Sequence, residues 1–221
     1  MIQPGLRKAM ILAAGRGTRL APLTDRTPKP LLPIKGRPLL HWQLQWLADS
    51  GVEACMINLH HLGEQIEADI GDGSEFGLKV SYSHEAQLLD SGGGIRNALD
   101  FFNDTPFLLL NGDIWTDFDF TTLPPAPPAP ARLHLVLTPT PAVRDQGDFD
   151  FAQGWVQQRG TSHVYCGIAV LHPALLRDRA IEPFSMRDVF FAEIDAGRLS
   201  AQTFQGVWHD IGSVEEYEHL R

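Results

Sequence analysis

The first fifty residues alternate between a short apolar run and an amphipathic stretch. Residues 8–12 form an apolar run that ends in two alanines and Gly15, which predicts a buried strand entering a glycine loop. Pro38 then begins a helical pattern with leucines on one face, and Gly51 ends it in the usual C-terminal cap position. The leucines at this spacing are Leu40, Leu44 and Leu47. The predicted order is therefore strand, loop and helix.

The same alternation continues through the middle of the chain. Apolar runs at 52–59 and 107–110, and an alternating stretch around Val80 and Tyr82, predict further strands. The helical patterns between them contain Leu62, Ile66 and Ile70, and then Ile95, Leu99 and Phe102. Strands that alternate with helices predict an α/β fold, in which a largely parallel sheet is covered by helices on both faces.

A proline-rich segment separates this part from the last ninety residues. Residues 124–130 contain five prolines, and we interpret them as a surface loop. The runs at 133–137 and 164–171 predict further strands, too little material for an independent core. No repeat with a period of about 20 to 50 residues is present. We therefore expect one domain over residues 1–221.

Composition narrows the class of protein. The chain is 43% hydrophobic and 20% charged, which excludes a disordered protein. Cys55 and Cys166 lie far apart with no CxxC motif, so we expect two buried, reduced thiols rather than a disulfide framework or a zinc site. The first residues lack the apolar run of a signal peptide, and no apolar run reaches about 18 residues. We expect a cytoplasmic protein without a membrane partner.

Charge is distributed unevenly along the chain. Residues 1–37 contain eight basic residues and one acid, a balance of +7, and the other 184 residues have −16, which together make the net charge of −9. A local cationic zone in an acidic protein suits a small polyanion, while the overall charge disfavours binding to long nucleic acids. The sequence therefore predicts a small anionic ligand and no nucleic-acid partner.

The glycine loop is the candidate site for that ligand. Gly15-Arg16-Gly17 directly follows the first predicted strand, so its backbone N–H groups can face a phosphate. A dinucleotide fingerprint would need a third glycine where Leu20 stands and an acid where Lys35-Gly36-Arg37 stands, and the GxxxxGK[ST] loop is absent. The sequence around Gly15 therefore matches neither the dinucleotide-binding loop nor the GxxxxGK[ST] loop well.

A longer match surrounds this loop. Residues 12–32 read LAAGRGTRLAPLTDRTPKPLL, which resembles the signature of the sugar-1-phosphate nucleotidylyltransferases. Further fragments follow in the family's order, namely Gly92-Gly93-Gly94-Ile95, Asn111-Gly112-Asp113, Pro141 through Gly147-Asp148-Phe149, and Trp208-His209-Asp210-Ile211-Gly212. The resemblance implies a Rossmann-like three-layer nucleotidyltransferase fold with a mixed, mostly parallel central sheet.

The resemblance also implies a reaction between two anions. An oxygen of a sugar 1-phosphate attacks the α-phosphorus of a nucleoside triphosphate, and pyrophosphate leaves. Such chemistry needs cations and fixed dipoles rather than a covalent nucleophile. The family pattern assigns Arg19 to the leaving pyrophosphate, Lys29 to phosphate oxygens at the reacting centre, and Asp113 with Asp210 to Mg²⁺. Lys29 lies between Pro28 and Pro30, which restrict the backbone around it.

Asp113 is also favoured by its position alone, because it follows the run at 107–110. Ligands of open α/β sheets bind beyond the carboxyl ends of the strands. Two carboxylates with phosphate oxygens and water make a plausible Mg²⁺ site. We therefore predict Arg19, Lys29 and Asp113 as catalytic residues and Asp113 and Asp210 as metal ligands.

The family pattern extends to both substrates. The expected nucleotide-binding residues are Ala13, Ala14, Gly15, Gly17, Thr18, Arg19, Lys29, Ala86, Gln87 and Gly92. On the sugar side we expect Asn111, whose amide suits a hydroxyl, and Gly147, where a missing side chain admits the sugar. Where many relatives have an acid and a lysine, this chain has Thr161-Ser162-His163, a departure that bears on how hexose hydroxyls are recognised.

Within the family, the fragments DSGGGI and GDGSEFGL are most similar to the bacterial branch that joins UTP and N-acetylmuramate 1-phosphate in cell-wall recycling. Guanylyl or thymidylyl transfer to mannose or glucose 1-phosphate is the alternative within the same class. A non-catalytic nucleotide-sugar sensor and a dinucleotide-dependent dehydrogenase are alternatives from other classes. The joint presence of Arg19, Lys29, Asp113 and Asp210 favours an enzyme over a sensor.

Overall fold

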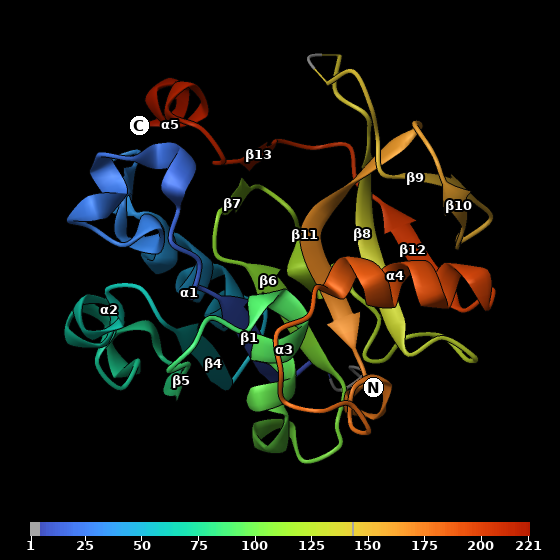
Figure 1. Ribbon diagram of the computed structural model, residues 1–221, viewed down its shortest axis with the longest axis horizontal. Helices are drawn as coiled ribbons and strands as arrows, with labels where there is room; N and C mark the ends of the chain where they lie inside the picture. Colours follow the sequence, from blue (N-terminus) through green and yellow to red (C-terminus); the bar gives the residue numbers. More distant parts are fainter. Residues whose placement is uncertain (1–4, 143) are drawn as a thin grey trace.

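The computed structural model describes residues 5–142 and 144–221, and one nine-stranded sheet is its centre (Figure 1). The order of strands across the sheet is β5-β4-β1-β6-β11-β8-β12-β10-β9, and β9 also pairs with β11. The bounds are β1 Lys8–Leu12, β4 Ala54–Leu59, β5 Lys79–His84, β6 Phe107–Asn111, β8 Leu133–Pro139, β9 Phe149–Ala152, β10 Trp155–Arg159, β11 His163–Leu171 and β12 Leu199–Thr203.

The sheet is mixed and mostly parallel, as expected. Strands β5, β4, β1 and β6 are parallel neighbours, and β12 lies parallel to β8. Strand β11 is antiparallel to both β6 and β8, and β10 is antiparallel to β12 and β9. Across the sheet, therefore, only β10 and β11 run against the other strands. The proline-rich loop leads directly into β8, so the last ninety residues extend the same sheet.

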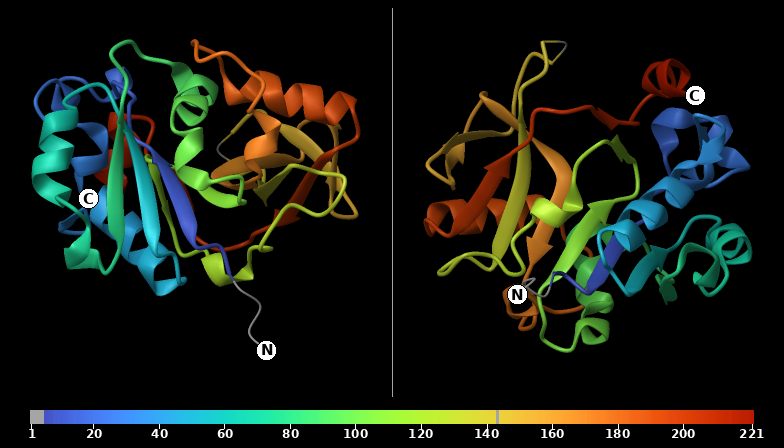
Figure 2. Two further views of the ribbon diagram at one scale, coloured as in Figure 1. Left: turned by 90° about the horizontal axis from the view of Figure 1, so that it is seen from below. Right: turned by 180° about the vertical axis from the view of Figure 1, so that it is seen from behind.

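Helices cover both faces of the sheet, which gives three layers (Figures 1 and 2). Helices α1 and α2 lie on one face, and α3 and α4 lie on the other. Side chains of β1 alternate between the two layers, because Ala9 and Ile11 pack in the α1 core and Met10 packs in the α3 core. The helices are α1 Leu39–Asp49, α2 Gly63–Ile70, α3 Asp90–Asn97, α4 Met186–Asp195 and α5 Val214–Leu220.

The third predicted helix is divided in the structure. Ile95 lies in α3, but Leu99 and Phe102 belong to a separate 3₁₀ turn, Leu99–Phe102. The backbone N–H of Ala98 lies within hydrogen-bond distance of both Gly94 O and Ile95 O, so the helix tightens and ends there. Three consecutive glycines in the helix weaken its propensity, and packing of the turn then decides the geometry.

Two short strand pairs lie outside the large sheet. Strand β2 Pro33–Ile34 pairs with β3 Arg37–Pro38, and β7 Ile114–Thr116 pairs with β13 Trp208–Asp210. In the second pair Asp210 stands opposite Ile114, and Ile211 N–H donates to Asp113 O at 2.9 Å. The C-terminal part of the chain is thereby joined to the end of β6.

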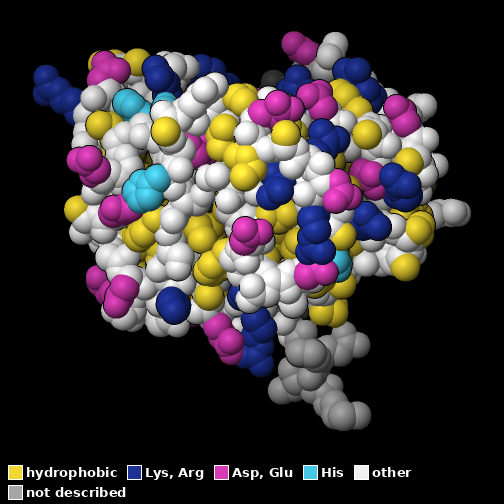
Figure 3. All heavy atoms as spheres, turned by 60° about the horizontal axis from the view of Figure 1, so that its bottom comes forward, with side chains coloured by type: hydrophobic (Ala, Val, Ile, Leu, Met, Phe, Trp, Pro, Cys, Tyr) yellow, Lys and Arg dark blue, Asp and Glu magenta, His cyan; other side chains and the backbone are white. Residues whose placement is uncertain are grey.

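The two cysteines are free and buried, as predicted. Burial raises the pKa of both thiols, that of Cys166 to about 12. No helix in the described residues is long and apolar enough to cross a membrane. On the face shown in Figure 3, basic and acidic side chains are interspersed.

Candidate active site

The candidate site lies where β1 and β6 end side by side. The two strands are parallel, with Leu12 beside Asn111, so the loop after β1 meets the turn after β6. Gly112 N–H donates to Leu12 O at 2.9 Å, and a Cβ at position 112 would lie 2.5 Å from that same oxygen. Only glycine fits this close approach, which sets Asp113 directly against the glycine loop.

Lys29 and Asp113 form an ion pair inside the site. Lys29 Nζ lies 2.6 Å from Asp113 Oδ2, and the Lys29 side chain is 13% exposed. The glycine loop packs against the lysine stem, because a Cβ at Gly17 would lie 3.2 Å from Lys29 Cβ. Gly17 has φ +62°, and Thr24 Oγ1 donates to its carbonyl at 2.9 Å. This fold of the loop positions the lysine against the turn of β6.

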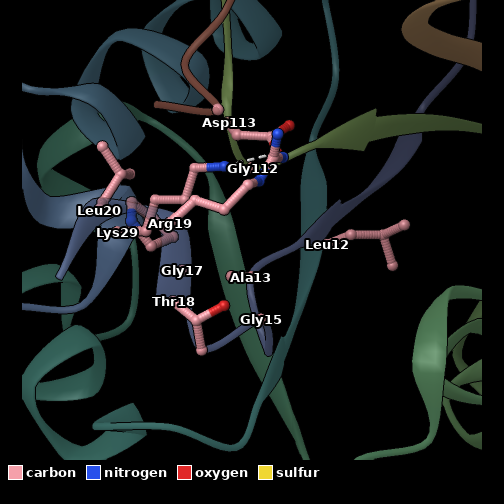
Figure 4. A pocket seen from close by; sticks show the side chains of 12 residues that line it. Leu12, Ala13, Gly15, Gly17, Thr18, Arg19, Leu20, Lys29, Gly112 and Asp113 are labelled. Carbon is pink, nitrogen blue, oxygen red and sulfur yellow. Dashed lines mark hydrogen bonds and ion pairs between the residues drawn. The ribbon is translucent and has the colours of Figure 1, made fainter. Parts of the chain in front are cut away.

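Arg19 is positioned by its neighbour in the 3₁₀ turn Thr18–Leu20. Leu20 is buried in a cluster with Ile211 and Tyr217 of the C-terminal segment. The Arg19 guanidinium reaches Gly212, where a Cβ would lie 3.0 Å from Nη2. Figure 4 shows Arg19 and Lys29 extending toward the end of the pocket at Asp113.

These residues enclose a pocket of about 210 Å³. Its lining includes seven of the predicted site residues, Ala13, Gly15, Gly17, Thr18, Arg19, Lys29 and Asp113, together with Gly212 of the C-terminal segment. An adjoining cavity of about 370 Å³ shares Gly15 and Asp113 with it and adds Ala14, Asn58, Leu88, Asp90, Ser91 and Asn111. The structure therefore brings the glycine loop, both cations and the first aspartate together.

Asp210 completes the acidic end of the site. It lies on β13 beside Asp113 and accepts a 3.3 Å contact from Arg144 Nη2. Burial and the nearby Asp113 carboxylate raise the pKa of Asp210, while Lys29 and Arg144 oppose that shift. A bound cation would relieve the repulsion between the two carboxylates. This donor set fits Mg²⁺, which commonly takes one or two carboxylates together with phosphate oxygens and water.

Three of the predicted nucleotide-binding residues, Ala86, Gln87 and Gly92, lie outside the linings of the two cavities beside the glycine loop. Ala86 and Gln87 are exposed on the segment after β5 and are absent from the linings of the two cavities. Gly92 is buried, and a Cβ there would lie 2.2 Å from the Phe184 ring. Their role in nucleotide binding stays a prediction.

A buried polar network behind the glycine loop was missed from the sequence. Asn58 Oδ1 accepts from Ala13 N–H at 2.8 Å, and its amide donates to Glu85 Oε1 at 2.7 Å. Glu85 Oε2 in turn accepts from Leu89 N–H at 2.9 Å. The network joins the glycine loop to the segment before α3. A signal was present, because Asn58 is a polar residue inside an apolar run.

The predicted sugar-side residues share a third cavity of about 770 Å³. Asn111, Gly147 and Asp210 all line it, although they come from β6, the loop before β9 and β13. A Cβ at Gly147 would lie 2.5 Å from Thr140 Oγ1 and 2.7 Å from Thr161 O, so a side chain does not fit there. The structure thus brings Asn111 and Gly147 to one wall beside the aspartates.

Comparison with known proteins identifies the family of this chain. A family model described as nucleotidyl transferase matches residues 8–133. The chain is 39% identical to the N-acetylmuramate alpha-1-phosphate uridylyltransferase of Neisseria meningitidis serogroup B, over 94% of each chain. It is 30% identical to the protein of that name in Caulobacter vibrioides, over 92% of this chain and 91% of the relative.

The solved structure of HddC from Yersinia pseudotuberculosis has the same fold. The TM-score is 0.81 at 24% identity, over 97% of this chain and 98% of that chain. The expected Rossmann-like nucleotidyltransferase fold is thereby confirmed. The family model covers more than half of the described chain, and the first relative covers nearly all of it. This chain therefore belongs to the nucleotidyl transferase family.

Proposed function

We propose that this enzyme transfers UMP from UTP to N-acetylmuramate 1-phosphate in the presence of Mg²⁺. An oxygen of the sugar phosphate forms a bond to the α-phosphorus, the bond from that phosphorus to the bridging oxygen breaks, and pyrophosphate leaves with the electron pair. The products are a UDP-sugar and pyrophosphate. The observation that carries this proposal is that Arg19, Lys29 and Asp113 line one pocket beside the glycine loop, while Asp210 stands opposite Ile114, the residue after Asp113.

The cations and backbone groups bring two anions together. The glycine loop presents N–H groups to the triphosphate, and Lys29 neutralises phosphate oxygens near the α-phosphorus. Arg19, at the solvent side of the same pocket, stabilises the charge that develops on pyrophosphate as it leaves. In this structure Lys29 Nζ contacts Asp113, and its flexible stem would let the amine turn from Asp113 toward the phosphates once a triphosphate binds.

Asp113 and Asp210 would hold Mg²⁺, which supplies charge stabilisation at the phosphates when bound. Relatives named for UTP and N-acetylmuramate 1-phosphate, matched along nearly the whole chain, support the choice of substrates. The cavity of about 370 Å³ beside Gly15 is the candidate for the base and ribose. Asn111 and Gly147 face the sugar in the third cavity. The proposal includes a single domain over 1–221 and a cytoplasmic location.

The test is pyrophosphate release from a grid of substrates. Purified protein and Mg²⁺ are incubated with UTP, GTP, dTTP or CTP and with the 1-phosphates of N-acetylmuramate, N-acetylglucosamine, glucose and mannose. We expect the highest kcat/KM with UTP and N-acetylmuramate 1-phosphate, and release that is roughly 100-fold slower or more with Asp113→Asn. Preference for another pair would replace the proposed substrates. No release with any pair would contradict turnover and favour a sensor.

A further inference from the structure

The third cavity is the largest hollow that adjoins the candidate active site, with a volume of about 770 Å³. Asn111 and Asp210 join it to the reacting centre. On another side Arg159 and Phe191 also line a neighbouring surface groove. The cavity therefore extends from Asp210 and Asn111 toward β10 and α4, and it is far larger than a phosphate requires.

Three arginines from three different elements line this cavity. Arg144 precedes β9, Arg159 ends β10, and Arg187 lies in the first turn of α4. Strands β9 and β10 pair with each other, and α4 packs on β10. Since residues far apart in the sequence converge here, the cationic lining is a product of the tertiary fold.

Within residues 5–142 and 144–221, one of the three arginines, Arg144, is paired with an acid. Arg144 Nη2 contacts Asp210. The other acid in the lining, Asp148, accepts from Tyr165 N–H at 2.9 Å. Among the described residues, Arg159 and Arg187 form no ion pair with a carboxylate. Two positive charges at the wall are thus available to an anion that enters the cavity.

Aromatic side chains lie beside these arginines in the cavity lining. The Arg159 guanidinium lies 4.4 Å from the centre of the Phe191 ring. A guanidinium stacked on a ring keeps its in-plane N–H donors free, which suits bidentate binding of a carboxylate. Phe190 of α4 packs edge-on against Tyr165, with 5.3 Å between the ring centres, and both residues line the cavity. The wall therefore offers an apolar surface for a hexose ring and two cations for an acidic substituent.

The sugar phosphate itself cannot use this pair while it reacts. Its phosphate must lie at the Asp113 and Asp210 end, where Lys29 is found. An anion at Arg159 and Arg187 must then belong to a different part of the same acceptor. Sugar 1-phosphates of the glucose or mannose type have no second anion, whereas a hexose with a carboxylate on an ether side chain does.

We propose that Arg159 and Arg187 bind a carboxylate carried by the hexose of the acceptor and so determine specificity for acidic sugar 1-phosphates. The inference rests on the proposed function, because it assumes that the acceptor occupies the third cavity. It adds the residues that distinguish a carboxylated acceptor from its neutral analogue.

The experiment compares two acceptors that differ in one group. N-acetylmuramate 1-phosphate is N-acetylglucosamine 1-phosphate with a carboxylate-bearing lactyl ether. Initial rates with UTP are measured for the parent, Arg159→Gln, Arg187→Gln and the double variant. For each single variant we expect the KM of the carboxylated acceptor to rise about tenfold, with kcat nearly unchanged. The KM of the neutral acceptor and the KM of UTP should stay within twofold of the parent.

Two further variants control for charge and folding. Arg159→Lys keeps the charge but loses the planar guanidinium with its paired N–H donors. Compared with Arg159→Gln, it should therefore show a smaller rise in the KM of the acidic acceptor. Arg132 is an exposed arginine that donates to Ala174 O and does not line the cavity. Arg132→Gln should therefore change neither the KM of the acidic acceptor nor the KM of the neutral one. Thermal unfolding is recorded for every variant, so that a loss of folding is seen as a lower Tm.

The outcomes separate this inference from the proposed function. Equal losses with both acceptors, or no loss with either, would overturn the role of the arginines while leaving uridylyl transfer intact. A parent enzyme that uses only neutral acceptors would also overturn it. Absence of turnover with every pair would instead contradict the proposed function.

Discussion

Asp113 lies between Lys29 and Asp210, so its carboxylate takes part in both the cation contact and the acidic pair. Replacing it with asparagine keeps the shape and removes the charge. We expect Asp113→Asn to lower kcat by roughly 10²-fold or more, because loss of charge stabilisation at phosphorus costs several kcal/mol. Steady-state kinetics measure the effect. The matched control is Asp119→Asn, which changes an exposed helix cap away from the site and should leave kcat unchanged.

We expect Lys29 to contribute more to binding and chemistry than to folding. Its amine is paired with Asp113, and the pair is partly open to solvent. We expect Lys29→Ala to lower kcat/KM for UTP by about 10- to 100-fold, through the lost phosphate contact. The change in Tm should be small. Lys35→Ala is the control, because Lys35 is exposed and stacks over Trp115 instead of facing the phosphates. Equal kcat/KM for UTP in Lys29→Ala and the parent would remove the lysine from the site.

At the scale of elements, the pairing of β8 with β12 buries a titratable side chain, His134 of β8, against polar side chains of β12. His134 contacts Ser200 Oγ at 3.0 Å and Gln202 Oε1 at 3.1 Å, and burial lowers its pKa below the ordinary 6.5. In the unfolded chain His134 therefore takes up a proton near pH 6.5, whereas in the folded chain it is protonated only at lower pH. Stability that is present above that pH is lost as the pH falls from about 6.5 to the folded pKa.

Replacing His134 should make the free energy of unfolding less sensitive to acid pH. We expect His134→Gln to show a smaller fall in the free energy of unfolding between pH 7 and 5 than the parent, measured by urea denaturation. His163→Gln, at the start of β11, is the control and should retain the parental slope. A slope in His134→Gln as steep as in the parent would show that another group is responsible.

Elements differ in how far local patterns predict them. Strands β1, β4 and β6 follow from their apolar runs, and α1 follows from its leucine spacing between Pro38 and Gly51. The helix around Ile95 was predicted too long, because the spacing of apolar residues does not reveal that Ala98 begins a tighter turn. Strand β13 was not predicted, since three residues form a strand only when β7 is there to pair with them.

At the scale of the whole molecule, ligand binding should stabilise the fold. The proposed triphosphate site joins β1, β6, the loop around Lys29 and the C-terminal segment at Gly212. A ligand that binds only the folded state adds about 2.7 kcal/mol at 100 times its Kd. We expect UTP with Mg²⁺ to raise Tm by roughly 5–10 °C, as measured by calorimetry. EDTA should abolish most of the rise. An equal rise in EDTA would contradict metal-dependent binding.

The sequence by itself determined the α/β alternation, the glycine loop and the placement of Lys29 between two prolines. These features depend on residues a few positions apart, where backbone sterics and apolar periodicity act directly. The family motif added the roles of Arg19, Asp113 and Asp210.

Asp113 and Asp210 are 97 positions apart in the sequence. Only the tertiary structure decided that they lie side by side, because β13 must pair with β7 to bring them together. It alone decided that Arg159 and Arg187 share one cavity, since that depends on how α4 packs against β10. Contacts between distant segments arise from the packing of whole elements, and no local pattern in the chain records them.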